Sequence, residues 1–314
     1  MTVRVFDRPS LEPAALAAAK GALTVSLCLP ARNEALTLAA ILDVVVGELM
    51  TPAAAVVDEL LVLDDGSTDA TARVAATHGA RVVAVDDVLT ALGPGRGKGN
   101  VLWRSLAASR GDLIVWCDAD VTSFSAHYVT SLLTPLIGDP TVGFVKGFYE
   151  RPTVGDPITG ADGHGGGRVT ELVARPLLSR FFPDLAGLRQ PLSGEMAGRR
   201  SVLEAVPFVQ GYGVETGLVI DVAQRFGIDR MVQVDLGVRR HRHQGLAALA
   251  VQATEILQVV LDRAGVRDRP DFTGTDGSGA ALGGVDLRRA DGSTVTVPLR
   301  QWPPMAEIRA GVQA

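Results

Sequence analysis

Two acidic residues stand at the end of residues 111–120, which read GDLIVWCDAD. The apolar run before them has the pattern of a buried strand, so Asp118 and Asp120 lie where that strand ends. Carboxylates two positions apart point the same way and repel each other unless a cation offsets their charge. Mg²⁺ is usually held by one or two carboxylates and by substrate phosphates, so the pattern favours a metal over a solvated, helix-capping turn. Taken alone, the motif indicates that a cation or solvent must meet the charge of Asp118 and Asp120.

Two further polar motifs follow other predicted strands: PARNE at residues 30–34 and DDGSTD at residues 64–69. Their backbone groups and carboxylates suit the hydroxyls and base of a nucleoside: Pro30, Ala31, Glu34, and Asp64 or Asp65. The alternative for each motif is helix capping, with Ser67 as an N-cap. Because both motifs precede the acidic pair in the same series of elements, they favour nucleotide binding.

A glycine-rich loop, GPGRGKG at residues 93–99, precedes a predicted helix. Arg96 and Lys98 in this loop suit a phosphate at a helix N-terminus, and the alternative is a loop whose cations meet only water. The loop is not a P-loop, because that motif needs Gly at position 92 and Ser or Thr at position 99. The sequence has Leu92 and Gly99 instead.

The spacing of apolar residues predicts strands that alternate with helices, which indicates an α/β fold with a mostly parallel sheet. The predicted strands are residues 23–29, 59–63, 81–85, 113–117, 142–149 and 231–234, with a weak one at 293–299. The predicted helices are residues 35–49, 68–77, 99–109, 169–182, 213–226 and 246–264. Ligands of such sheets bind outside the carboxyl ends of the strands. The four motifs are therefore expected at one edge.

The composition of the 314 residues excludes several classes of protein. Hydrophobic residues make up 47%, which argues against disorder. The net charge is −5 and no Lys/Arg-rich run is present, so we expect no nucleic-acid partner. No apolar run reaches membrane-spanning length, and residues 1–20 read as an arm and a helix rather than a signal peptide. Cys28 and Cys117 lie in strand-like runs, so buried free thiols and a cytoplasmic location are expected.

The four motifs, in this order, resemble those of GT-A glycosyltransferases, in which a strand followed by Asp-x-Asp marks the metal and diphosphate site. Four blocks in the second half are similar to the glucosyl-3-phosphoglycerate synthase family: residues 165–178, 190–195, 211–221 and 236–243. The resemblance covers about residues 6–264, and QWPPM at residues 301–305 echoes it. It implies a GT-A fold, a Rossmann-like sheet with a mixed C-terminal acceptor-binding subdomain. It also implies a retaining transfer of glucose from UDP-glucose to the 2-hydroxyl of 3-phosphoglycerate.

The resemblance also implies roles for residues of the donor site. Nucleoside, diphosphate and sugar contacts are implied at Pro30, Ala31, Glu34, Asp65, Lys98, Asp118, Ala119, Leu192, Tyr212 and Glu215. The implied metal ligands are Asp120 and His241, with Mg²⁺ as the cofactor and Mn²⁺ as the alternative. Catalytic roles are expected for Lys98, Asp120 and Glu215.

The acceptor site is implied by a second set of residues, Arg151, Gly167, Arg168, Thr170 and His243. Glycines before a helix free backbone N–H groups, and the Arg168 guanidinium suits a phosphate. The sequence departs from the family pattern in two places. Asp65 stands where Ser is common, and His243 stands where the family has Asn, although its imidazole suits the carboxylate of 3-phosphoglycerate.

The resemblance implies four segments: an N-terminal arm and helix (1–20), a nucleotide-sugar half (21–140), an acceptor half (141–264) and a tail (265–314). The apolar helix at residues 246–264 and the tail suggest a homodimer, and burial of the helix in the chain's own core is the alternative. The resemblance, to a family of dimers, favours the homodimer. Two alternative functions stay open at this point. One is a mannosyl-3-phosphoglycerate synthase that uses GDP-mannose, and the other is a non-catalytic sensor of nucleotide sugars.

Overall fold

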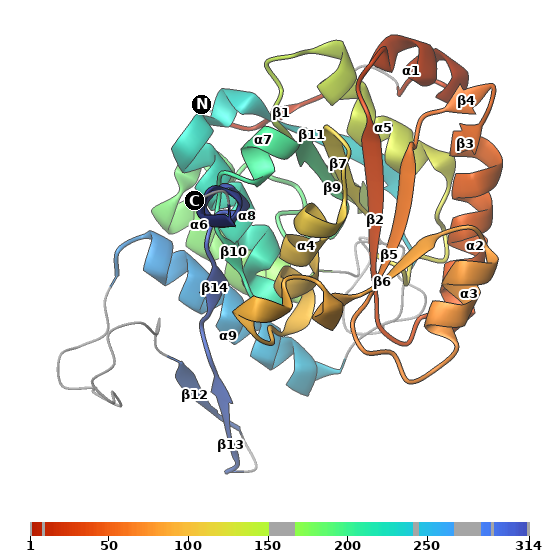
Figure 1. Ribbon diagram of the computed structural model, residues 1–314. Helices are drawn as coiled ribbons and strands as arrows, with labels where there is room; N and C mark the ends of the chain where they lie inside the picture. Colours follow the sequence, from red (N-terminus) through yellow and green to blue (C-terminus); the bar gives the residue numbers. More distant parts are fainter. Residues whose placement is uncertain are drawn as a thin grey trace, which may run out of the picture.

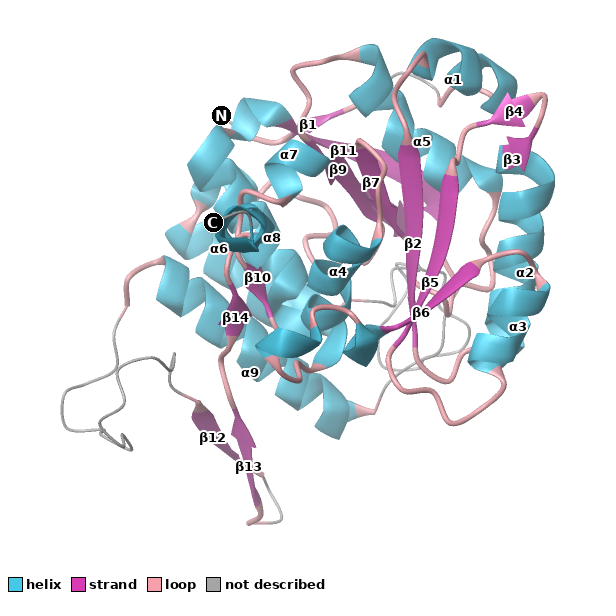
Figure 2. Cartoon of the chain, viewed as in Figure 1, coloured by secondary structure: helices cyan, strands magenta, loops and turns pink. Residues whose placement is uncertain are grey.

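The computed structural model describes residues 2–7, 10–150, 167–240, 245–266, 284–289 and 292–312. At its centre is an eight-stranded sheet in the order β1-β11-β8-β9-β7-β2-β5-β6 (Figures 1 and 2). In the described sheet, β9 runs antiparallel to both β7 and β8, and the other neighbouring pairs are parallel. The predicted α/β fold with a mostly parallel sheet is confirmed. The strands are β1 (Arg4–Val5), β2 (Val25–Ala31), β5 (Glu59–Asp64), β6 (Arg81–Ala84), β7 (Leu113–Trp116), β8 (Phe144–Glu150), β9 (Met196–Arg199) and β11 (Met231–Val238).

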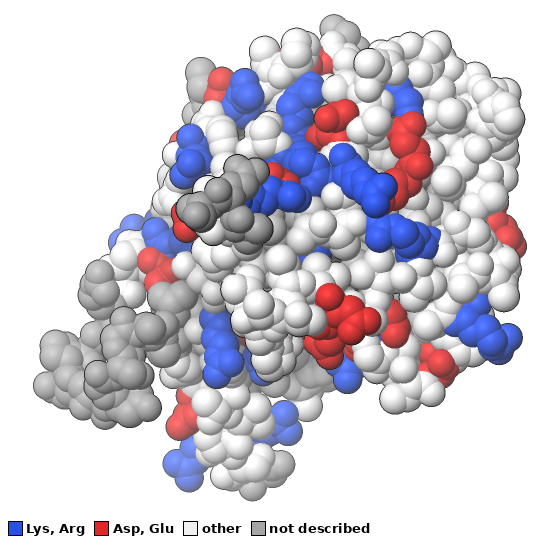
Figure 3. All heavy atoms as spheres, viewed as in Figure 1, with Lys and Arg blue, Asp and Glu red and all other residues white. Residues whose placement is uncertain are grey.

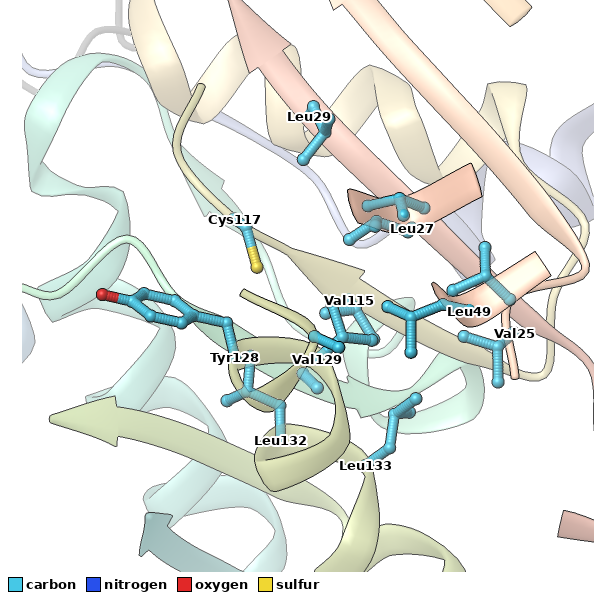
Figure 4. Packing of buried hydrophobic residues seen from close by; sticks show 14 of the residues in the cluster. Val25, Leu27, Leu29, Leu49, Val115, Cys117, Tyr128, Val129, Leu132 and Leu133 are labelled. Carbon is cyan, nitrogen blue, oxygen red and sulfur yellow. The ribbon is translucent and has the colours of Figure 1, made fainter. Parts of the chain in front are cut away.

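Helices cover both faces of the sheet. Successive residues of each buried strand point to opposite faces, and both sets are apolar, so each face must be shielded from water. Val25, Leu27 and Leu29 of β2 pack in one cluster, whereas Cys28 packs in the other. The first cluster includes residues of α1 (Pro13–Lys20), α2 (Ala35–Val44), α3 (Thr71–Thr77) and α5 (Ala126–Gly138). The second includes residues of α4 (Gly97–Ala108), α6 (Arg175–Phe181), α7 (Arg200–Leu203), α8 (Val214–Phe226), α9 (Leu246–Arg263) and α10 (Met305–Val312). Figure 4 shows the first cluster, with Tyr128, Val129, Leu132 and Leu133 near Val115 and Cys117.

Three two-stranded sheets lie outside the central one. They pair β3 (Met50–Thr51) with β4 (Ala54–Ala55), β10 (Phe208–Val209) with β14 (Gln301–Trp302), and β12 (Val285–Arg288) with β13 (Thr294–Val297). The β10–β14 pair fastens the C-terminal segment to the body, and the Trp302 ring stacks on Trp103 of α4 at a centroid distance of 4.8 Å. The β12–β13 hairpin projects from the body beside α9 (Figure 1).

Some predicted elements need correction. The helix predicted at residues 68–77 begins at Thr71, because Ser67 does not cap it: the Ser67 Oγ instead accepts the backbone N–H of Asn33. The helices predicted at residues 35–49 and 169–182 each include a π-helical turn, at Val45–Leu49 and Thr170–Ala174. Strand β9 and helix α5 were not predicted, and neither were β14 and α10 in the tail.

Charges of both signs are interspersed on the face drawn in Figure 3, where uncharged atoms cover most of the surface. The net charge of −5 is therefore not gathered into one acidic surface on that face. The charges that matter most for chemistry are the buried ones described next.

Candidate active site

The charged residues of the candidate site lie at one edge of the sheet, the edge formed by the carboxyl ends of its parallel strands. Strands β2, β5 and β7 are parallel and end at this edge, where Asp118 and Asp120 follow β7. Strand β11 also ends there and is followed by Arg239. Because β9 is antiparallel, it begins where its neighbours end, so the residue before it, Glu195, is brought to the same edge. The expectation that the strand-end motifs converge is met by the geometry.

Asp118 is the centre of a chain of buried ion pairs. Its Oδ1 lies 2.5 Å from the Lys98 Nζ, and its Oδ2 lies 2.8 Å from the Arg239 Nη2. Burial alone would raise the pKa of the Asp118 carboxyl, but the charges of Lys98 and Arg239 hold it well below its ordinary value. Asp118 therefore stays ionised, and it pairs with two cations that its motif alone did not predict.

Lys98 joins this chain to the helix that carries Glu215. The Lys98 Nζ lies 2.9 Å from the Glu215 Oε1, and the Glu215 side chain is only 6% exposed at the start of α8. Burial would lower the pKa of Lys98, but Asp118 and Glu215 more than offset this effect and raise it. Lys98 is thus a fixed, permanently charged cation in the first turn of α4, which is the expected position for a phosphate contact.

Arg239 is the second buried cation at this edge. Its Nη2 lies 3.1 Å from the Asp120 Oδ1 as well as 2.8 Å from Asp118, and its Nη1 donates to the Tyr149 hydroxyl at 2.7 Å. The guanidinium carbon lies 5.1 Å from the centre of the Tyr149 ring, in cation–π range. One oxygen of each carboxylate in the Asp-Ala-Asp motif thus faces the same cationic nitrogen.

This convergence bears on the predicted metal site. The Arg239 Nη2 occupies the point that Asp118 and Asp120 both face, so a metal ion would bind beside the guanidinium. The Asp120 side chain is 30% exposed and offers a hard carboxylate, so it fits Mg²⁺ or Mn²⁺. The other predicted ligand, His241, lies outside the described residues. Within the described part of the chain, no three His, Cys, Asp or Glu side chains form a complete metal site.

The two nucleoside motifs contact each other directly. Strands β2 and β5 pair in register at Ala31 and Asp64, and the Asn33 Oδ1 accepts the Thr68 backbone N–H at 2.8 Å. Asn33 adopts a left-handed conformation with φ of 58°, which Asn tolerates better than most residues. Asp65 lies 3.6 Å from the Arg32 guanidinium, and burial raises the pKa of its carboxyl.

Glu255 of α9 holds the glycine-rich loop at residues 93–99 against the loop around Tyr212. The Glu255 Oε1 lies 3.1 Å from the Arg96 Nη2, and its Oε2 accepts the Tyr212 backbone N–H at 2.5 Å. The loops approach so closely that a Cβ on Gly97 would lie 2.8 Å from the Gly211 Cα. The Tyr212 side chain is 45% exposed and Leu192 is half-buried, whereas Ala119 is buried.

The predicted acceptor residues are only partly described. Gly167 has a φ of 88°, Arg168 is exposed and Thr170 is buried at the start of the π-helical turn, which packs against α9. Two further predicted residues, Arg151 and His243, lie outside the described residues.

Four charged residues at or beside the site were not singled out from the sequence: Lys146, Glu195, Arg239 and Glu255. Lys146 was detectable, because it interrupts the apolar run VGFVKGFY of a predicted strand. Its Nζ donates to the Ser193 carbonyl at 2.5 Å, and burial lowers its pKa to about 8. Glu195 was hidden because the antiparallel strand after it was not predicted.

Comparisons with known proteins agree with this geometry. Residues 26–206 match the family model described as glycosyl transferase family 2. Over 98% of its length and 98% of the relative's, the chain is 43% identical to glucosyl-3-phosphoglycerate synthase of Mycolicibacterium smegmatis. The chain belongs to the glucosyl-3-phosphoglycerate synthase family. The chain is also 45% identical to glucosyl-3-phosphoglycerate synthase of Petrotoga mobilis, over 76% of this chain and 73% of that protein.

Solved structures of the family align over almost the whole chain. Glucosyl-3-phosphoglycerate synthase from Mycobacterium tuberculosis, in complex with Mn²⁺, UDP-glucose and phosphoglyceric acid, matches with a TM-score of 0.82 and 38% identity. The match covers 98% of this chain and 99% of that one. A complex of the same enzyme with Mn²⁺, UDP and glucosyl-3-phosphoglycerate matches with a TM-score of 0.81 and 39% identity over 98% of this chain and all of that one. The GT-A fold of the family is therefore the fold of this chain.

Proposed function

We propose that this protein transfers glucose from UDP-glucose to the 2-hydroxyl of 3-phosphoglycerate, with retention, and releases UDP. The observation that carries the proposal is the match over 98% of the chain to an enzyme whose structure holds Mn²⁺, UDP-glucose and phosphoglyceric acid together. The buried chain of Lys98, Asp118 and Arg239 supports it, because these residues place two cations at the predicted donor edge.

The metal cofactor we propose is Mg²⁺ or Mn²⁺, since family structures contain each with UDP. Asp120 and His241 are the proposed ligands, and the bound metal supplies positive charge to the leaving diphosphate. The residues of this chain do the remaining work. Lys98 faces the same charge from the first turn of α4, and Asp118 keeps Lys98 protonated and in place.

The sugar and the acceptor are proposed to lie on either side of this edge. Glu215, Tyr212 and Leu192 contact the glucose, and the nucleoside lies against Pro30, Ala31, Glu34, Asp65 and Ala119. The acceptor contacts are Arg151, Gly167, Arg168, Thr170 and His243. These residues hold the 2-hydroxyl against the anomeric carbon. The hydroxyl oxygen forms the new bond from the side that UDP leaves, and a donor phosphate oxygen takes its proton.

A donor-by-acceptor matrix tests the proposal. UDP-glucose and GDP-mannose are each combined with 3-phosphoglycerate and with glycerate, in the presence of Mg²⁺ or Mn²⁺, and nucleotide release is measured. We expect UDP-glucose with 3-phosphoglycerate to give the fastest release, with an α-linked product by NMR. Faster turnover of GDP-mannose would favour the mannosyl alternative, and release without acceptor dependence would contradict the proposed transfer.

We propose that residues 21–140 serve the donor and residues 141–264 serve the acceptor, and that the protein is cytoplasmic. No helix in the described ranges has both the length and the apolar character needed to span a bilayer. The free, buried thiols of Cys28 and Cys117 support a reducing compartment. A fluorescent fusion imaged in the host cell tests the location.

We also propose a homodimer, formed in part by the β12–β13 hairpin. A two-stranded hairpin alone is marginally stable in water, and this one projects from the body (Figure 1). Its Leu287 and Val295 face each other in register and are half-buried where the hairpin contacts α9, and Val285 beside them is 39% exposed. Analytical ultracentrifugation of the wild type should give a dimer, and Leu287→Lys should shift it towards monomer. A monomeric wild type would contradict the proposal.

A further inference from the structure

We infer that Glu195 is a positioning residue that holds Arg239 at the two acidic residues of the site. The inference rests on the proposed function, because it assigns a part in that reaction to a residue without an assigned role. It is carried by the burial of Glu195, by its contact with Arg239 and by its place at the start of β9.

The carboxylate of Glu195 is fully buried, at 0% exposure. Among the described residues, neither of its oxygens has a hydrogen-bond partner. A buried carboxylate without such partners is costly, and burial accordingly raises the pKa of Glu195. An apolar residue would fill this place at less cost, so stability alone does not explain a charge here.

The described cation in contact with this charge is Arg239. The Glu195 Oε1 lies 3.4 Å from the Arg239 Nη2, the same nitrogen that lies 2.8 Å from Asp118 and 3.1 Å from Asp120. Three carboxylates thus surround one guanidinium nitrogen, while the Nη1 is held by the Tyr149 hydroxyl. The Arg239 side chain is only 5% exposed, so water contributes little to its placement.

Glu195 differs from the other two carboxylates in what else it can bind. Asp120 is the proposed metal ligand, and Asp118 is shared with Lys98 at 2.5 Å. Glu195 is sealed inside the protein, so its attraction for Arg239 does not compete with metal or substrate. Glu195 therefore fixes the guanidinium independently of Asp120, which is available to the proposed metal, and of Asp118, which also holds Lys98.

The backbone makes this contact rigid. Glu195 precedes β9, which is paired with β7 at Met196–Trp116 and with β8 at Met196–Lys146. The Glu195 carbonyl accepts the Gly147 N–H at 2.9 Å. A Cβ on Gly147 would lie 3.0 Å from that carbonyl oxygen, so the strands approach as closely as glycine permits.

The test replaces Glu195 by Gln, which keeps the shape and removes the charge. A misplaced catalytic group can cost about 100-fold in rate, so we expect kcat to fall by about 10- to 100-fold. The KM values for both substrates should change by less than about twofold. Glu195→Asp, which retains the charge, should recover part of kcat.

The matched control is Glu204→Gln. Glu204 also pairs with arginines, Arg200 and Arg309, each at 3.0 Å, but it lies beyond the opposite end of β9. Its loss should lower the melting temperature and leave kcat unchanged. A Glu195→Gln variant that behaves like this control would overturn the inference.

A double-mutant cycle shows whether Glu195 acts through Arg239. If it does, Glu195→Gln should cause no further loss of kcat in an Arg239→Gln protein, whereas independent roles would multiply the two losses. If Glu195→Gln does not fold, the cycle is run with Glu195→Asp. Crystal structures of the variants test the inference even if the proposed reaction fails: Arg239 should leave Asp118 and Asp120 in the Gln variant, and an unmoved guanidinium would contradict it.

Discussion

At the scale of single residues, the site contains buried charges that destabilise the folded state. Lys146 is 1% exposed, and its ammonium donates to the carbonyl of Ser193, in the turn that precedes Glu195. Burial lowers its pKa from the ordinary 10.5 to about 8. Because the folded state binds this proton less tightly than the unfolded state, the charged form of Lys146 opposes folding.

This shift predicts how stability changes with pH. The penalty is complete below pH 8 and fades as the pH rises from about 8 to about 10.5, where the unfolded chain also loses the proton. We expect the free energy of unfolding of the wild type to rise over this window relative to Lys146→Met. Urea denaturation of both proteins at each pH measures the difference. A constant difference would show that Lys146 is not buried as a cation.

Asp120 gives a second prediction at this scale. Replacing it by Asn removes the charge that faces the proposed metal while it keeps the size of the side chain. We expect Mn²⁺ binding in the presence of UDP, followed by electron paramagnetic resonance, to weaken by at least about tenfold, roughly the loss of one charge-assisted contact. Asp139→Asn, at the end of α5, is the control and should bind Mn²⁺ normally. Unchanged binding in Asp120→Asn would exclude Asp120 as a ligand.

At the scale of elements, helix α9 connects the glycine-rich loop at residues 93–99 to the loop around Tyr212. Glu255 near its middle contacts Arg96 and the Tyr212 backbone, whereas Arg263 at its end forms a two-bond ion pair with Asp221 of α8 at 2.8 and 3.0 Å. Helix α9 thus makes one contact with the candidate site, through Glu255, and another that only joins it to α8, through Arg263.

These two contacts predict different consequences. Glu255→Gln should loosen both loops and raise the KM for UDP-glucose several-fold, with a smaller effect on kcat. Asp221→Asn leaves Arg263 without its main partner, so it should lower the melting temperature and leave the KM unchanged. Steady-state kinetics and thermal unfolding of both variants separate the roles. Equal KM values in the two variants would contradict the proposed link between α9 and the donor.

The elements that the sequence predicts are those marked by a pattern of apolar residues. The parallel strands were predictable because apolar runs between helices have few other interpretations. The motifs with Asp118 and Lys98 were then predictable because they lie next to these elements. Strand β9 is four residues long and includes Gly198 and Arg199, so no apolar period marks it. Glu195 and Arg239 were missed for a related reason, since their partners come from elements far apart in the chain.

At the scale of the whole molecule, the C-terminal segment packs against helix α4. The Trp302 indole stacks on Trp103 and donates to the Asn100 Oδ1 at 3.0 Å, and the Arg104 guanidinium lies 5.6 Å from its ring centre. The β14 segment of the tail thus packs on α4, which carries Lys98 in its first turn.

Trp302→Ala tests this support. Because Trp302 is half-buried, we expect a loss of stability of about 2 kcal/mol, below the 3–5 kcal/mol of a fully buried tryptophan. Ligand binding stabilises the folded state by an amount that falls as affinity falls, so UDP and Mg²⁺ should stabilise the variant less than the wild type if α4 is disturbed. Thermal unfolding with and without the ligands measures both effects. A variant as stable as the wild type would show that the tail does not support α4.

The position of β9 has a consequence for how the chain folds as it is synthesised. Strands β6, β5, β2 and β7 form one half of the sheet, and β8, β11 and β1 form the other, with β9 as the described strand that joins them. The first half can assemble once residue 116 has left the ribosome, but β7, paired with β2 on one side, stays unpaired on its other side until residues 196–199 emerge. The buried charge cluster of Asp118, Glu195 and Arg239 is therefore among the last parts of the protein to form, and a chain interrupted before β9 would have the first half of the sheet without this cluster.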